Sequence, residues 1–99
     1  LPGKTYPGHS APQATEKIAK AAQAQHRWRR TGFDERARLL QAAAAVLRRR
    51  RDEFAGLMTD EMGKTLTDGR AEIDKCASAC EHFAVHAAGY LARQSVEAE

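Results

Sequence analysis

The sequence predicts an all-α fold of three long helices in an antiparallel hairpin arrangement. Two observations support this prediction. Apolar residues recur at three- and four-residue steps through most of the chain, and no segment alternates apolar and polar residues over a length that suits a strand. In addition, no proline follows Pro12. Helices joined by short breaks, here near Gly32 and Gly63, fold back on one another to bury their apolar stripes.

The length sets an upper limit on the core. A chain of 99 residues forms at most one domain and buries only about 60–68% of its unfolded surface. The first residue is Leu1 rather than Met, and we expect the chain to be a piece of a longer protein. Residues 1–10 contain two prolines and two glycines and are expected to form an irregular lead-in, followed by a helical fragment over residues 11–99.

The first helix is predicted over residues 11–30. It ends at a break formed by Thr31 and Gly32. One side of this helix carries most of its apolar residues, namely Ile18, Ala21, Ala22 and Trp28, with Gln25 among them. We therefore interpret Trp28 as a packing residue, because it falls on the apolar side.

The second helix is predicted as one rod over residues 33–62. Gly32 is a plausible N-cap, acidic residues fill the first turn, and Gly63 ends the helix. The stripe consists of Phe33, Ala37, Leu40, Ala44, Leu47, Phe54 and Met58, with Arg51 at the one skipped position. At ~1.5 Å per residue such a rod is about 45 Å long, far more than the roughly 13 Å radius of gyration of a 100-residue domain. We expect this helix to pack against a protein surface that lies outside this chain.

The third helix is predicted from Thr65 or Thr67 to about Arg93. Thr65 and Asp68 have the spacing of a capping box. The predicted stripe is Ile73, Cys76, Cys80, Phe83, Ala87 and Tyr90, widened at seven-residue intervals by Ala77, Ala84 and Leu91.

The net charge of +3 is unevenly distributed along the chain. Residues 27–51 carry nine arginines and two acidic residues, whereas residues 52–99 carry ten acidic and four basic residues. One interpretation is that neighbouring helices neutralise each other. The alternative is a stand-alone helical module that uses the run Arg48 to Arg51 on nucleic acid. Four consecutive residues spread around a full helical turn, which favours the first interpretation.

The tripeptide Gly63-Lys64-Thr65 has the order that ends a phosphate-binding P-loop. A P-loop requires a further glycine at position 58, where this chain has Met58, and a preceding strand. The alternative is a helix stop at Gly63, which tolerates a positive φ. The helix stop is favoured, so no phosphate site is predicted.

Two pairs of residues with metal-binding side chains lie in the third helix. Cys76 and Cys80 are one turn apart, and so are His82 and His86. At 100° per residue the two pairs point roughly 80–160° apart, so all four cannot bind one ion. We predict reduced, shielded cysteines and surface histidines, with no metal site. Cysteines without an apolar leader favour a cytoplasmic protein, and no apolar run approaches the ~18 residues of a membrane span.

Residues 11–95 resemble the N-terminal helical part of the aldehyde dehydrogenase superfamily. The features that match are Trp28, Glu35-Arg36-Ala37 with Leu40, Arg51-Asp52-Glu53, Glu61-x-Gly63-Lys64, Glu72-Ile73 and Phe83-Ala84, in this order. Within the superfamily, "MTDEMGKTL" followed by "AEIDKCASACEHFAVHA" is most similar to succinate-semialdehyde dehydrogenases.

The resemblance implies a parent enzyme that oxidises an aldehyde to a carboxylate with NAD or NADP. In the family a cysteine nucleophile, a glutamate base and the cofactor loops lie downstream of the matched region, and Cys76, Cys80 and Glu61 do not match them. The resemblance therefore assigns no catalytic, cofactor-binding or metal residue to this chain, and it implies that the fragment is inactive and binds no cofactor. It also implies packing on the remainder of the dehydrogenase chain, namely its Rossmann and catalytic domains, and a homo-oligomeric parent, with no nucleic-acid or membrane partner.

Overall fold

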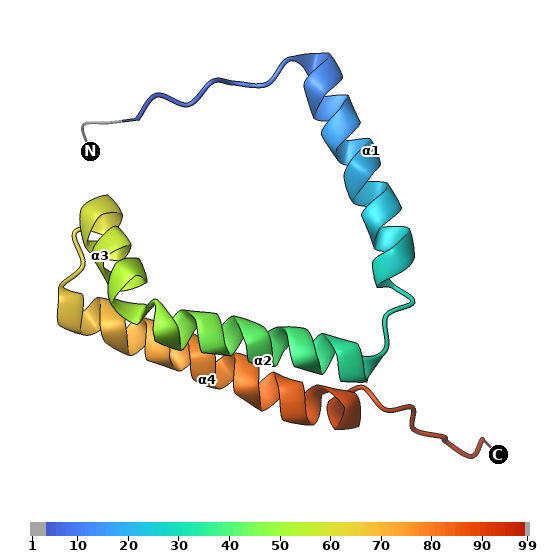
Figure 1. Ribbon diagram of the computed structural model, residues 1–99. Helices are drawn as coiled ribbons and strands as arrows, with labels where there is room; N and C mark the ends of the chain where they lie inside the picture. The colour runs from blue at the N-terminus through green and yellow to red at the C-terminus, as the bar shows by residue number, and fades with distance from the viewer. Residues whose placement is uncertain (1–3, 99) are drawn as a thin grey trace. The chain divides into compact units, whose positions relative to one another are not determined.

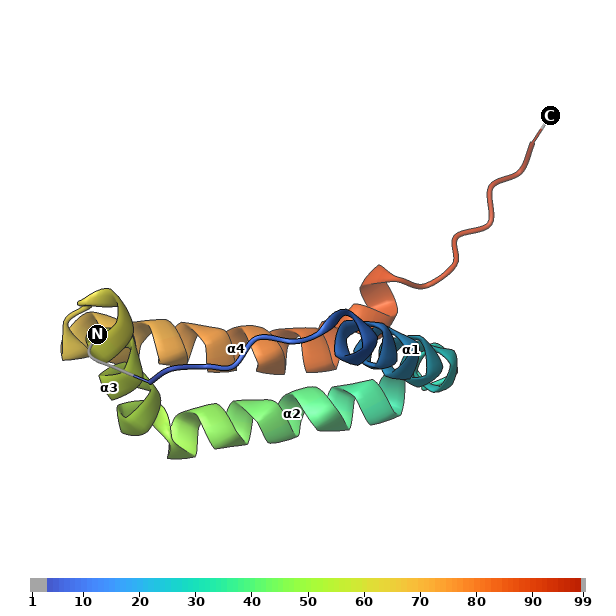
Figure 2. The same ribbon diagram turned by 90° about the horizontal axis from the view of Figure 1, so that it is seen from above.

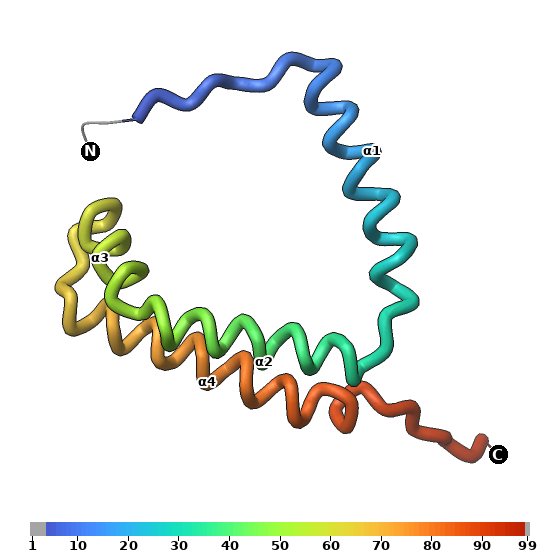
Figure 3. Tube along the Cα trace, in the orientation of Figure 1, coloured from blue at the N-terminus to red at the C-terminus, as the bar shows by residue number. Residues whose placement is uncertain are grey.

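The computed structural model describes residues 4–98, which contain four helices and no strand. The chain divides into two compact units, one ending at Gly32 and the other beginning at Phe33. Figure 1 labels the helices, and Figure 3 traces the same path as a tube. The all-helical prediction is confirmed for the described residues.

Helix α1 (Ala11–Trp28) is the regular element of the first unit. Ser10 begins it with a capping box: its Oγ accepts from the Gln13 N–H at 3.3 Å, and its own N–H donates to Gln13 Oε1 at 2.9 Å. The helix has no buried residue, so its apolar stripe is not covered within this unit. Residues 4–10 have no regular structure, and residues 1–3 of the predicted lead-in lie outside the described part.

The second unit contains α2 (Phe33–Arg49), α3 (Arg51–Met62) and α4 (Leu66–Tyr90). The prediction of one rod over residues 33–62 was wrong, because the chain bends at Arg50 (φ −105°, ψ 23°). Hydrogen bonding continues through the bend: the Arg50 N–H donates to the Val46 carbonyl at 2.9 Å, and the Arg50 carbonyl accepts from the Phe54 N–H at 3.1 Å. The apolar period is therefore unbroken, although the helix axis turns.

Helix α4 pairs with both α2 and α3 (Figure 1). Arg48 of α2 pairs with Glu81, and Asp52 of α3 pairs with Arg70. A later residue of the α2–α3 segment therefore contacts an earlier residue of α4. The pairing is therefore antiparallel. Seen from above, α2 and α4 still run alongside each other (Figure 2).

The closest helix packing in this unit is between α3 and α4. Gly69 is buried against Ala55, and a Cβ added at Gly69 would lie 3.2 Å from Ala55 Cα and Cβ and 3.3 Å from its carbonyl oxygen. Because only a glycine permits this approach, α3 settles onto the first turns of α4 and departs from the axis of α2. This contact is the physical reason for the bend at Arg50, where the sequence has no proline or glycine to signal a kink.

The buried core of the second unit is small. The buried hydrophobic residues are Ala44, Ala55, Ile73 and Ala77. On α4 the packed row steps by four residues through Gly69, Ile73 and Ala77, so the predicted stripe was only partly right. Cys76, Phe83 and Tyr90 were expected to pack but are exposed. Around the helix axis they lie about 60°, 80° and 100° from Ile73, all on the same side of this row.

Candidate functional site

The tripeptide Gly63-Lys64-Thr65 forms the break between α3 and α4. Gly63 has a left-handed φ of 68°, and its N–H donates to the Thr59 carbonyl at 2.9 Å. Thr65 caps α4 by accepting from the Asp68 N–H at 3.2 Å. Lys64 Nζ lies 2.5 Å from Glu72 Oε2, and this hydrogen bond raises the pKa of Lys64. Gly63 and Thr65 therefore end α3 and begin α4, and Lys64 between them pairs with α4 through Glu72.

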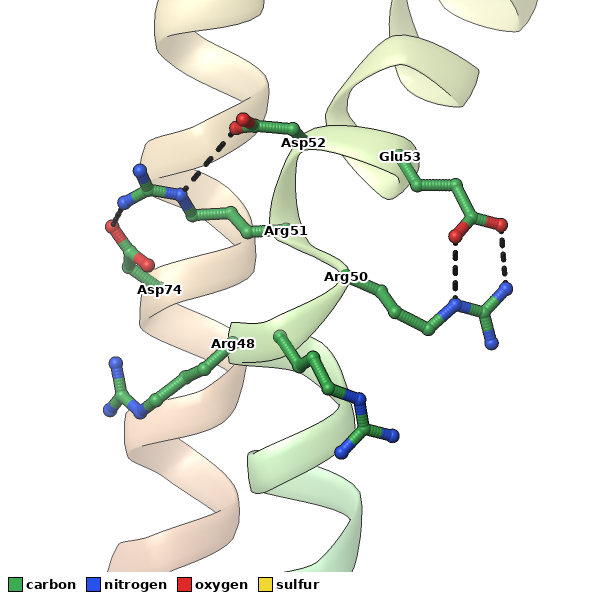
Figure 4. Close-up of a pocket in the computed structure, with 7 residues that line it drawn as sticks. Arg48, Arg50, Arg51, Asp52, Glu53 and Asp74 are labelled. Carbon is green, nitrogen blue, oxygen red and sulfur yellow. Dashed lines mark hydrogen bonds and ion pairs between the residues drawn. The ribbon is translucent and has the colours of Figure 1, made fainter.

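The arginine run Arg48 to Arg51 lines a surface pocket of about 400 Å³ together with Asp52, Glu53 and Asp74 (Figure 4). It lies where α2 bends into α3, alongside α4. Consecutive residues on a helix point in directions about 100° apart. The guanidinium groups consequently leave the backbone toward different partners.

Most of these arginines are paired with carboxylates. Arg48 Nε donates to Glu81 Oε1 at 2.8 Å, and Arg51 NH1 donates to Asp74 Oδ2 at 3.1 Å. Both pairs join the α2–α3 segment to α4. Arg51 also lies 3.9 Å from Asp52.

Arg50 instead forms a local pair. Its guanidinium donates twice to Glu53, at 2.8 and 2.6 Å (Figure 4). The same guanidinium lies 4.8 Å from the centre of the Phe54 ring. These hydrogen bonds raise the pKa of Arg50 and lower the pKa of the Glu53 carboxyl. Glu81 acts on Arg48 in the same way, and Arg48 lowers the pKa of Glu81.

This pairing favours the interpretation in which neighbouring helices neutralise each other. It does not favour the alternative, a surface that binds nucleic acid. A phosphate-binding face collects unpaired cations on one side, whereas here three neighbouring arginines hold carboxylates of the same chain. The Arg48–Glu81 and Arg50–Glu53 pairs are exposed and the Arg51–Asp74 pair is part-buried, so they fix geometry more than they stabilise the fold.

The two cysteines do not lie in equivalent positions. Both are free, but Cys76 is exposed and Cys80 is half-buried. The prediction of two shielded cysteines was therefore wrong for Cys76. It lines a shallow pocket with Lys64, Ala71, Glu72, Lys75 and Ala79.

The unequal exposure of the thiols predicts unequal labelling. A maleimide is expected to modify Cys76 several times faster than Cys80, because access limits the reaction of a partly covered thiol. Peptide mapping by mass spectrometry at early times measures the two rates, and Cys76→Ser should remove the fast phase. Equal rates at the two positions would contradict the packing of α4 described above.

The histidines of α4 are exposed, as the sequence predicts. Within residues 4–98, three or more His, Cys, Asp or Glu side chains nowhere gather closely enough to hold a metal ion. In the same part of the chain, no helix has the length and apolar character required to cross a membrane.

Comparison with known proteins gives a consistent result over nearly the whole chain. The Aldehyde dehydrogenase family matches residues 3–99. An aldehyde dehydrogenase of Paenarthrobacter nicotinovorans is 40% identical over 93% of this chain, and a probable NADP-dependent succinate-semialdehyde dehydrogenase of Synechocystis sp. is 39% identical over 94%. A succinate-semialdehyde dehydrogenase [NAD(P)+] of Escherichia coli is 41% identical over 65% of the chain.

The matched region is a small part of each relative. It spans 20% of the proteins from Paenarthrobacter and Synechocystis and 14% of the protein from Escherichia coli. The resemblance expected from the sequence motifs is confirmed by both the family match and the names of these relatives. The chain belongs to the aldehyde dehydrogenase family.

Proposed function

We propose that this chain is the N-terminal helical part of an NAD(P)-dependent dehydrogenase that oxidises succinate semialdehyde to the carboxylate. The observation that carries the proposal is the similarity to relatives named as succinate-semialdehyde dehydrogenases, combined with a match that spans only about one fifth of their length. The small core and the uncovered apolar residues of α2 and α4 support it, since such a unit gains stability from a larger partner surface.

The described residues do not fit a dinucleotide cofactor. Such a site needs a glycine-rich turn between a strand and a helix. Residues 4–98 contain no strand, and Gly63, Lys64 and Thr65 are occupied in the break between α3 and α4. We therefore assign cofactor binding and catalysis to the remainder of the parent protein, and this chain contributes helices that pack against it.

The role of the fragment is that of a helical support. Large apolar side chains of α2, α3 and α4, among them Leu39, Leu57 and Phe83, are exposed in this unit. We assign these side chains to contact with the Rossmann and catalytic domains of the parent. Homo-oligomerisation belongs to the same proposal for the parent, and the two free cysteines favour a cytoplasmic location.

The proposal predicts where activity resides. The isolated 99-residue chain is expected to show neither NAD(P) binding nor turnover of succinate semialdehyde, because aldehyde oxidation requires a nucleophile, a cofactor cradle and an oxyanion stabiliser in one site. The full-length parent is expected to show both. Titration calorimetry with NAD and NADP, followed by an assay of reduced cofactor, makes the comparison. Tight NAD binding to a monomer of these 99 residues would overturn it.

A further inference from the structure

Three aromatic side chains on one side of α4 lie close together. His82 and His86 have ring centroids 4.5 Å apart, and the Tyr90 ring lies 5.9 Å from each of them. The three residues are spaced by four positions, so they occupy one row of the helix. His82 Nε2 and the Tyr90 hydroxyl are 2.9 Å apart, within hydrogen-bond distance, so the first and last residues of the row are in contact.

The donor atoms of this group suit a transition metal. Imidazoles one helical turn apart can reach the same ion, and imidazole nitrogen is a preferred ligand of Cu²⁺, Ni²⁺ and Zn²⁺. A phenol oxygen lies within hydrogen-bond distance of one of these imidazoles. The histidine pair alone offers two ligands, and Tyr90 supplies a third that histidine spacing in the sequence does not indicate.

The surroundings leave these donors accessible. All three residues are exposed. The nearest acidic neighbour in sequence, Glu81, is held by Arg48 and so does not compete for the site. The remaining ring contact is Phe83, whose ring meets His82 edge-on at 5.2 Å.

We propose that His82, His86 and Tyr90 form a surface site for a divalent transition-metal ion, with Cu²⁺ bound more tightly than Ni²⁺ or Zn²⁺. The order follows from the general affinity series of these ions for nitrogen and oxygen ligands. Binding breaks the Tyr90 O–H bond, forms a metal–oxygen bond and releases one proton to solvent. No electron is transferred. The site is independent of the dehydrogenase function proposed above.

The test uses the 99-residue chain without a histidine tag, at concentrations where sedimentation velocity shows a monomer. Cys76→Ser and Cys80→Ser are introduced first, so that thiols neither bind nor reduce the added copper. Titration calorimetry with Cu²⁺ should give one ion per chain. Electron paramagnetic resonance should show nitrogen ligands, and visible absorption should show a phenolate-to-copper band.

Single substitutions assign the ligands. His82→Ala or His86→Ala should weaken Cu²⁺ binding by more than about 10–100-fold, the loss that follows removal of even an outer-shell partner of a metal site. Tyr90→Phe keeps the ring and should remove the visible band. His26→Ala, which changes an exposed histidine of α1, is the matched control and should leave binding unchanged.

Two outcomes would overturn the proposal. One is an unchanged Cu²⁺ affinity after His82→Ala or His86→Ala, compared with the chain that carries only the two cysteine substitutions. Circular dichroism must show intact helices in this comparison. The other is a visible band that persists in Tyr90→Phe, because the phenolate would then not be a ligand.

Discussion

Replacing Gly69 with alanine is expected to destabilise the second unit, although alanine is the better helix former. The added Cβ would lie 3.2 Å from Ala55 Cα and Cβ and 3.3 Å from its carbonyl oxygen. Two of these neighbours are backbone atoms, which cannot rotate away. Overpacking of this kind costs about 1–3 kcal/mol, and the higher helix propensity of alanine returns at most about 1 kcal/mol. Urea unfolding followed by circular dichroism measures the difference.

Gly56→Ala is the matched control for this experiment. Gly56 lies inside α3, one residue from Ala55, and a Cβ there meets nothing within 4 Å. The control is expected to stabilise the chain by about 0.4–1 kcal/mol, because alanine restricts the unfolded state without a clash. If both substitutions shifted the unfolding midpoint equally, the close approach of α3 and α4 would be wrong.

The isolated chain is expected to self-associate at micromolar concentration, because its core cannot cover its large apolar side chains. Phe83, Val85 and Leu91 of the α4 end are 50%, 68% and 69% exposed. Contiguous apolar patches of this kind favour association. Phe83 and Leu91 also line a pocket with Phe33, Ala37 and Leu40 of α2. Sedimentation velocity over a range of concentrations measures the distribution of species.

Charged substitutions test whether this surface drives the association. Phe83→Glu combined with Leu91→Glu should weaken association at least about tenfold, because each charge would have to be desolvated in the contact. Val96→Glu is the control, since Val96 is 88% exposed and lies beyond α4. The prediction would be contradicted if the 99-residue chain without substitutions stayed monomeric at all concentrations and bound no hydrophobic dye.

The pairing of the arginine cluster could be predicted from the sequence only in part. The uneven charge of the two halves of the chain indicated pairing between helices, and the structure joins Arg48 to Glu81 and Arg51 to Asp74. The particular partners could not be predicted. They depend on the register of α4 against α2 and α3, and that register is fixed by packing around Ala44, Ala55, Ile73 and Ala77.

The sequence by itself determined the helical class, the break at Gly63 and the capping role of Thr65. These features depend on hydrogen bonds between residues at most four positions apart, so local sequence is sufficient to specify them. Family membership also followed from the order of motifs along the chain.

Only the tertiary structure decided the bend at Arg50 and the exposure of Cys76. The bend follows from the contact of Ala55 with Gly69, which are distant in sequence. The same contact belongs to the row of α4 that packs, and Cys76 lies about 60° from Ile73 in that row. Periodicity places side chains around one helix axis, but the energy of packing two helices determines which row is buried and whether the axis stays straight.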